Sequence, residues 1–161
     1  MNVDTVLRRL GDLERSLADL YEWYAEVFAS DPEAVYVFLK MFREEMGHVR
    51  RVDYHRRLLQ KDPALPVDVD IDVAEIDGIL QKAVALRGVR PNPTLEDAIR
   101  TALDLEMTAA ESFYRNARRQ ASPAVARLLA VLGGEDKDHV GRLREMARFR
   151  GIPTPGPGAS G

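Results

Sequence analysis

A carboxylate and an imidazole lie on the apolar face of one long helical stretch, which the sequence predicts from Pro32 to Lys61. Glu45 and His48 are three residues apart, so both project from the same side of a helix. That side is otherwise apolar, with hydrophobic residues at three- and four-residue spacings: Val35, Phe38, Met41, Phe42, Val49, Val52 and Leu59. Burying both polar groups without partners would cost several kcal/mol. Because a bound metal ion would neutralise them, we expect a metal site here.

This pair has a counterpart later in the chain. Asp136 and His139 have the same spacing, and each lies 91 positions after its equivalent. The flanking residues agree as well, in the segments Glu44-Glu45-x-x-His48-Val49-x-Arg51 and Glu135-Asp136-x-x-His139-Val140-x-Arg142. Agreement at one constant offset indicates an internal repeat.

Two single glutamates extend the repeat. Glu14 and Glu106 are 92 positions apart, and each interrupts an apolar helical stripe. An aromatic residue follows each of them seven positions later, Tyr21 in the first case and Phe113 in the second. Each half of the chain therefore offers one single carboxylate and one carboxylate-x-x-His pair.

Four long helices would carry these residues. The apolar periodicity predicts the first, second and fourth over about 3–29, 32–61 and 123–150. The third is predicted to start near residues 92–94, with Asn92 or Thr94 as its cap, and to end at about residue 120. Asp31-Pro32 and Ser122-Pro123 each combine a capping residue with a proline at the first helical position. Between the halves, residues 62–93 form a segment too long for a turn, and Val73 to Leu86 reads as a short helix ended by Gly88.

These elements predict an all-α fold, a four-helix bundle in which a long crossover containing a short helix joins the second and third helices. We expect one domain over residues 1–150. Residues 151–161 are rich in glycine and proline, and we expect this tail to be disordered.

Composition narrows the class of protein. The 161-residue chain has a formal net charge of −3 and no cysteine, so disulfides, thiolate metal sites and thiol nucleophiles are excluded. We expect no nucleic-acid partner, because no basic block is visible in the sequence. The longest apolar run is about six residues, far too short to span a membrane, and we expect a cytoplasmic protein.

The whole pattern resembles the ferritin-like di-iron carboxylate superfamily, and within it the helical domain of rubrerythrins. The resemblance covers about residues 3–150, and it implies that two iron ions are held by Glu14, Glu45, His48, Glu106, Asp136 and His139. Manganese or zinc are possible substitutes for iron. The chain departs from the family in having Asp136 where glutamate is usual, and in having Ala109 where rubrerythrins often carry a further glutamate.

The resemblance further implies an oxidoreductase that reduces hydrogen peroxide or O₂. The electrons would come from an external donor, because the rubredoxin module of full rubrerythrins needs cysteines that this chain lacks. Two other functions use the same residues: a ferroxidase that stores iron, as ferritins do, or a metal-stabilised helical scaffold without turnover.

Three points stay open at the level of sequence. The bridging carboxylates could be Glu45 with Glu106, or Glu14 with Asp136. The repeat register favours Asp136 over the adjacent Glu135 as the ligand beside His139. Outward-pointing aromatic residues also predict a second buried surface, covered by the crossover helix or by a homodimer partner: Trp23, Tyr36 and Tyr54.

Overall fold

Five helices and no strand make up the regular structure of residues 2–61, 68–120 and 122–154, the part of the chain that the computed structural model describes. The helices are α1 (Val3–Val27), α2 (Pro32–Lys61), α3 (Val73–Leu86), α4 (Leu95–Ala117) and α5 (Pro123–Phe149). The bounds of α2 and α3 are those predicted. The helices α1, α4 and α5 end slightly earlier than predicted.

Side-chain caps explain where most of the helices begin. The carboxylate of Asp31 accepts a hydrogen bond from the backbone N–H of Ala34 at 3.1 Å, and the Thr94 hydroxyl accepts one from Asp97 at 3.1 Å. The prediction for Ser122 is only partly right, since it occupies the N-cap position of α5 but its side chain makes no capping bond.

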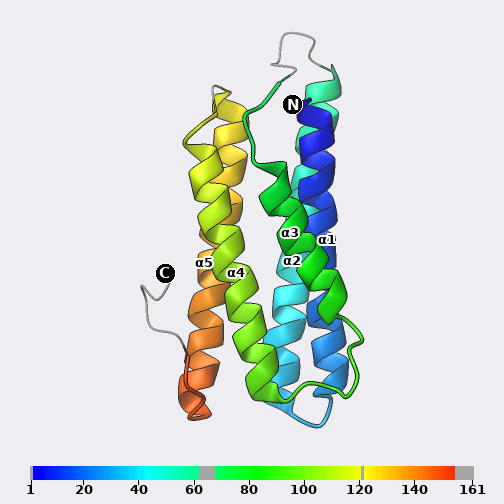
Figure 1. Cartoon of the computed structure of the whole chain (residues 1–161), viewed down its shortest axis with the longest axis vertical. Coiled ribbons are helices and arrows are strands. Elements are labelled where there is room, and N and C mark those ends of the chain that lie inside the picture. Colours follow the sequence, from blue (N-terminus) through cyan, green and yellow to red (C-terminus); the bar gives the residue numbers. More distant parts are fainter. Residues whose placement is uncertain (1, 62–67, 121, 155–161) are drawn as a thin grey trace.

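The chain forms two antiparallel helix pairs with α3 between them. In Figure 1, α1 runs down and α2 returns upward, while α4 runs up and α5 returns downward. Helix α3 packs against α1 and α4, and α2 also contacts α5. Polar contacts link α3 to both pairs, because Arg87 pairs with Asp19 of α1 at 3.3 Å and Glu75 accepts a hydrogen bond from Ser112 of α4 at 2.7 Å.

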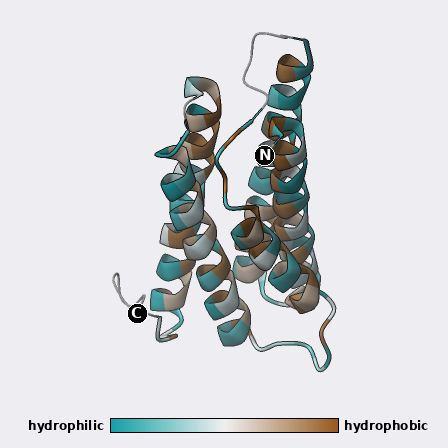
Figure 2. Cartoon of the chain, turned by 45° about the horizontal axis from the view of Figure 1, so that its top comes forward, coloured by the Kyte–Doolittle hydropathy of each residue, from teal (hydrophilic) through white to brown (hydrophobic). Residues whose placement is uncertain are grey.

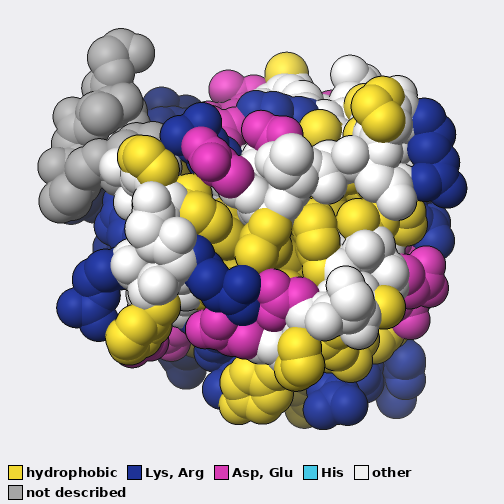
Figure 3. Space-filling view, turned by 90° about the horizontal axis from the view of Figure 1, so that it is seen from below, with side chains coloured by type: hydrophobic (Ala, Val, Ile, Leu, Met, Phe, Trp, Pro, Cys, Tyr) yellow, Lys and Arg dark blue, Asp and Glu magenta, His cyan; other side chains and the backbone are white. Residues whose placement is uncertain are grey.

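The core lies between the helices. Figure 2 shows hydrophobic residues on helix faces that turn toward one another, and Figure 3 shows them between the helix ends, with charged side chains around them. Three aromatic rings are fully buried between α1 and α2 and contact one another: Tyr21 and Tyr24 of α1 and Phe38 of α2. Glutamate, aspartate and histidine side chains interrupt this apolar interior at one level.

The exposure of individual residues tests what the sequence predicts about the outward-pointing aromatic residues and the C-terminal tail. Tyr36 and Tyr54 do point outward, with 64% and 59% of their surface exposed, whereas Trp23 is partly buried against the core. Of the tail, Ile152 packs on the core, and residues 155–161 lie outside the described part of the chain. No helix among the described residues is long and apolar enough to cross a membrane.

Candidate metal centre

Six acidic and histidine side chains from four helices meet in the interior. They are the six predicted ones, each no more than 2% exposed: Glu14 of α1, Glu45 and His48 of α2, Glu106 of α4, and Asp136 and His139 of α5. They form two groups, in each of which one ligand atom per residue lies within 4.8 Å of the others. The first group is Glu14, Glu45, His48 and Asp136, and the second is Glu45, Glu106, Asp136 and His139.

Glu45 and Asp136 belong to both groups. They come from α2 and α5, at equivalent positions of the internal repeat. The shared pair is therefore neither of the two pairs considered from the sequence, each of which combined one of these residues with a single glutamate. Glu14 and Glu106 instead lie at opposite ends of the site, one in each group.

Both imidazoles turn the same ring nitrogen, Nδ1, toward the carboxylates. His48 Nδ1 lies 2.8 Å from Glu45 Oε2 and 3.0 Å from Glu14 Oε2. His139 Nδ1 lies 2.9 Å from Glu45 Oε1 and 3.2 Å from Glu106 Oε2. The rings are nearly parallel, with an interplanar angle of 22° and centroids 5.8 Å apart. The site thus has the two-fold character that the repeat predicts.

Several carboxylate oxygens in the site lack a hydrogen-bond donor. Both oxygens of Glu45, both of Asp136 and Oε1 of Glu14 are buried and make no hydrogen bond within the described part of the chain, although the imidazole nitrogens are close to Glu45. Burying such atoms without a partner is costly. The donor set of carboxylate oxygen and imidazole nitrogen, without sulfur, fits iron, manganese or zinc. These residues therefore have the composition and the unsatisfied oxygens expected of a metal centre.

Burial and mutual repulsion shift the pKa values of the single carboxylates upward. Burial raises the pKa of Glu14 to about 8, against the opposing effect of its hydrogen bond with His48. Burial also raises the pKa of Glu106 and, together with the neighbouring carboxylates, raises that of Asp136 well above its usual value. Glu14 consequently holds its proton near neutral pH when nothing else neutralises it, and the other two carboxyl groups shift in the same direction.

The groups at the middle of the site shift toward their charged forms. Burial opposes ionisation of Glu45, yet the contacts with His139 and His48 outweigh it and lower its pKa. Burial likewise disfavours the imidazolium ions, but Glu14 and Glu45 raise the pKa of His48 to about 12, and Glu106 and Glu45 raise that of His139 to about 11. Protons thus occupy the places where cations would bind.

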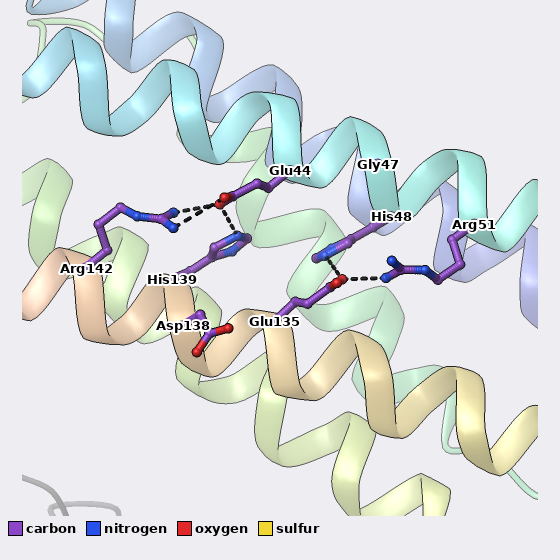
Figure 4. Close-up of a pocket in the computed structure, with 8 residues that line it drawn as sticks. All are labelled: Glu44, Gly47, His48, Arg51, Glu135, Asp138, His139 and Arg142. Atoms are coloured by element: carbon purple, nitrogen blue, oxygen red, sulfur yellow. Dashed lines mark hydrogen bonds and ion pairs between the residues drawn. The ribbon is translucent and has the colours of Figure 1, made fainter.

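A second layer of acids holds the outer nitrogens of the histidines, and it crosses between the two halves. Figure 4 shows Glu44 of α2 beside His139 and Arg142 of α5, and Glu135 of α5 beside His48 and Arg51 of α2. His139 Nε2 donates to Glu44 at 3.0 Å, and His48 Nε2 lies 2.7 Å from Glu135. Arg142 donates to Glu44 at 2.6 Å, and Arg51 donates to Glu135 at 2.5 Å.

This layer determines which imidazole nitrogen is available inside. In the neutral imidazole that a metal would require, a carboxylate that accepts the proton on Nε2 leaves the lone pair on Nδ1, the nitrogen that here points at the carboxylate cluster. Glu135 takes the outer position and Asp136 the inner one, as the repeat register favours. The sequence did not predict that each acid contacts the histidine of the other half. The repeat did show an acid at both equivalent positions, Glu44 and Glu135, and an arginine three residues after each histidine, Arg51 and Arg142.

Tyr21 breaks the symmetry of the centre. Its buried hydroxyl donates a hydrogen bond to Glu106 Oε1, so a residue of the first half contacts the single glutamate of the second. The repeat partner of Tyr21 is Phe113, which has no hydroxyl to offer Glu14. No group among the described residues forms a hydrogen bond with Glu14 Oε1. The two ends of the site therefore differ in polarity.

A cleft between α2 and α5 leads to the histidines from outside. It has a volume of about 340 Å³ and is lined by the four acid–arginine partners together with both histidines, Gly47 and Asp138. Gly47 and Asp138 are themselves repeat equivalents. The opposite side, toward α1 and α4, is covered by α3. The cleft therefore brings a solvent-filled space to the outer side of the two imidazoles.

Comparisons of the chain with protein-family models, with curated proteins and with solved structures gave no match. The functional assignment therefore depends on the geometry of the site and on the repeated sequence pattern.

Proposed function

We propose that the chain is a dinuclear metal oxidoreductase with a ferritin-like four-helix arrangement, similar to rubrerythrins, and that it reduces hydrogen peroxide or O₂ with electrons from an external donor. The observation that carries the proposal is the pair of overlapping four-residue groups that share Glu45 and Asp136. A shared carboxylate pair between two sets of terminal ligands is the arrangement that a two-metal centre needs.

In this proposal Glu45 and Asp136 would contribute to both of two metal sites. Glu14 and His48 would complete one site, and Glu106 and His139 would complete the other. Two divalent cations cancel the charge of the four carboxylates, and they relieve the buried oxygens that lack donors. Iron is the metal proposed, with manganese or zinc as possible substitutes.

The reaction uses chemistry that the protein alone lacks. A pair of redox-active ions supplies two electrons to a peroxide or O₂ molecule. The cleft between α2 and α5 admits the oxidant, while the apolar helix interfaces around the site limit the entry of bulk water. Glu44 and Glu135 hold the imidazoles in one orientation, and the Tyr21 hydroxyl fixes Glu106.

Anaerobic reconstitution with ferrous iron, followed by mixing with hydrogen peroxide in a stopped-flow instrument, tests the proposal. We expect two irons per chain and rapid oxidation of both by one equivalent of peroxide. Oxidation of the iron by peroxide should be slower in Glu45→Ala than in the parent chain. The matched control is Glu111→Ala, at an exposed glutamate on α4, which should leave the rate unchanged.

The other two functions give different results. Uptake of many more irons per chain and assembly into large shells on gel filtration would indicate storage. A bound metal that peroxide does not oxidise would indicate a scaffold. Either result would overturn the proposed reduction of peroxide.

A further inference from the structure

Five basic side chains follow one face of α2 along most of its length, with two exposed tyrosines among them. At about 100° per residue, the seven residues fall within one sector of the helix, on the side opposite Glu45. We refer to them as the cationic stripe: Tyr36, Lys40, Arg43, Arg50, Tyr54, Arg57 and Lys61. These residues are scattered over 26 positions of the sequence and come together only on the helix surface. The sequence therefore contains no continuous basic block.

The positive charge of the stripe is not compensated within the described part of the chain. None of its five basic side chains makes an ion pair there, whereas two other arginines of α2 that lie outside this sector, Arg51 and Arg56, pair with Glu135 and Asp4. Glu33, which lies just outside this sector in the first turn of α2, is bound to Arg150 at 2.6 Å. Free cations gathered on one face of a chain with net charge −3 indicate an anionic partner.

The composition of the stripe favours a protein as that partner. Tyr36 and Tyr54 are 64% and 59% exposed, and Leu58 beside them is 44% exposed. A hollow of about 480 Å³ adjoins Tyr36 and Arg43 at the lower end of α2. Arginine and tyrosine are, with tryptophan, the residues enriched where protein interfaces gain their binding energy.

A second copy of the same face does not fit. Among the described helices, α3 packs on α1 and α4, and Tyr36 and Tyr54 on the outer side of α2 stay exposed. Two stripes placed face to face would bring like charges together, which disfavours association. The homodimer predicted from Tyr36 and Tyr54 would therefore need a different surface, and the partner that complements the stripe is acidic.

Gly47 places this surface beside the metal centre. It lies in the sector of the stripe between Arg43 and Arg50, it lines the cleft, and it precedes His48 in the chain. Packing does not require a glycine there, because an added Cβ would come no closer than 3.8 Å to another group, Arg50 Nη2. A glycine inside a helix costs about 0.5–1 kcal/mol relative to alanine. Without a side chain at this position, a docked surface can approach the backbone next to His48.

We propose that the cationic stripe of α2 is the docking surface for an acidic electron-transfer protein, which delivers electrons to the centre beside Gly47 and His48. The inference rests on the proposed function, which needs an external donor. Reduction of one hydrogen peroxide to two waters consumes two electrons and two protons. Two molecules of a one-electron iron–sulfur protein supply the electrons in two successive encounters, and solvent supplies the protons through the cleft.

Binding is measured first, because it does not depend on turnover. The probe is a fluorescently labelled acidic [2Fe–2S] ferredoxin, titrated with the full chain at low ionic strength and followed by anisotropy. The test variant is Arg43→Glu/Arg50→Glu/Arg57→Glu. The control, Arg15→Glu/Arg119→Glu/Arg127→Glu, makes the same change in net charge at exposed arginines that form no ion pair with any described residue and lie outside α2. Thermal unfolding followed by circular dichroism checks that both variants fold.

We expect the stripe variant to bind the ferredoxin at least about tenfold more weakly, with little change for the control and with an affinity that falls as salt is added. The rate at which reduced ferredoxin reduces the metal-loaded chain should fall by a similar factor. Peroxide oxidation of dithionite-reduced chain should be unchanged in both variants.

Each contrary result has a separate meaning. If peroxide fails to oxidise the reduced parent chain, the proposed function is wrong, while the ferredoxin titration still tests the docking surface. If the ferredoxin does not bind, or if both triple variants weaken it equally, the docking proposal is overturned. The docking proposal would also be overturned if the chain bound duplex DNA or anionic vesicles more tightly than the ferredoxin and the stripe variant lost that binding. Self-association in sedimentation that is lost in the stripe variant would overturn it as well.

Discussion

Asp136 has a shorter side chain than its repeat partner Glu45, yet it belongs to both groups of candidate ligands. One turn before it, Gly133 lies against α4, where an added Cβ would be 3.2 Å from the carbonyl oxygen of Ala110. A larger residue could not approach α4 so closely. The glycine therefore lets α5 lie near α4 at the level where a shorter carboxylate has to reach the centre.

This placement predicts different results for two neighbouring substitutions. Asp136→Asn should weaken both metal sites, because Asp136 is shared between them. Glu135→Gln should keep two ions and lose about 10–100-fold in affinity, as expected for a residue that only holds a histidine ligand. Titration of each variant with Mn²⁺ measures both effects. Loss of a site in Glu135→Gln with normal binding in Asp136→Asn would transfer the ligand role to Glu135.

The protons held in the centre predict how metal binding depends on pH. His48 and His139 have pKa values of about 12 and 11 and Glu14 has one of about 8, so all three are mostly protonated near pH 7 without metal. Metal ligation requires their deprotonated forms, and binding must release these protons. We expect proton release on Mn²⁺ binding, measured by calorimetry in buffers of different ionisation enthalpy, and an affinity that falls as the pH is lowered. An affinity independent of pH between about 6 and 8 would contradict this description.

At the scale of helices, close contact between α4 and α5 depends on Gly133. Gly133→Ala should destabilise the fold by about 1–3 kcal/mol, because the added methyl group meets backbone and ring atoms of α4. Gly141 on the same helix has nothing within 4 Å of an added Cβ, so Gly141→Ala should stabilise it by about 0.5–1 kcal/mol. Urea unfolding of the two variants measures the difference. Equal effects would show that the approach of α5 to α4 does not depend on Gly133.

Local signals made most of the helices predictable. Asp31-Pro32 fixes the start of α2, and Gly88 follows the end of α3 with a φ of +75°, a conformation that glycine adopts without strain. The six site residues were predictable because the apolar stripes and the repeat offset identify them without reference to three-dimensional contacts.

Contacts between the two halves could not be predicted in the same way. The bonds of Glu44 to His139 and of Tyr21 to Glu106 join residues 95 and 85 positions apart. They depend on how α2 faces α5 and α1 faces α4, which no local spacing encodes. The arrangement of the helices also decides that Glu45 and Asp136 belong to both groups of candidate ligands. The sequence alone therefore left the bridging pair undecided.

At the scale of the molecule, the two helix pairs are joined at a few places. Helix α3 packs against both pairs, the candidate metal centre lies between them, and Arg150 after α5 closes the lower end. Arg150 donates to both oxygens of Asp31 at 2.7 Å and to Glu33 at 2.7 Å. Removing any of these links should loosen one pair against the other.

The link through Arg150 predicts a pH-dependent part of the stability. Its hydrogen bonds lower the pKa of Asp31 from 3.8 to about 2. Because the folded-state pKa lies below the value in the unfolded chain, this stability is present above about pH 4 and is lost as the pH falls through about 2. Arg150→Met should cost about 0.5–1 kcal/mol near pH 7 in urea unfolding, a cost that shrinks toward pH 2. Arg148→Met, at an arginine with no carboxylate partner among the described residues, is the control, and an equal loss there would contradict the role of Arg150.

The central claim is that two ions share Glu45 and Asp136, and Mn²⁺ loading tests it most directly. The measurement combines metal analysis with electron paramagnetic resonance of the loaded chain. We predict two ions per chain with the spectrum of a spin-coupled pair about 3.5–4 Å apart, and loss of the coupled spectrum in Glu45→Ala. One ion per chain, two uncoupled ions, or a coupled pair that persists in Glu45→Ala would contradict the claim.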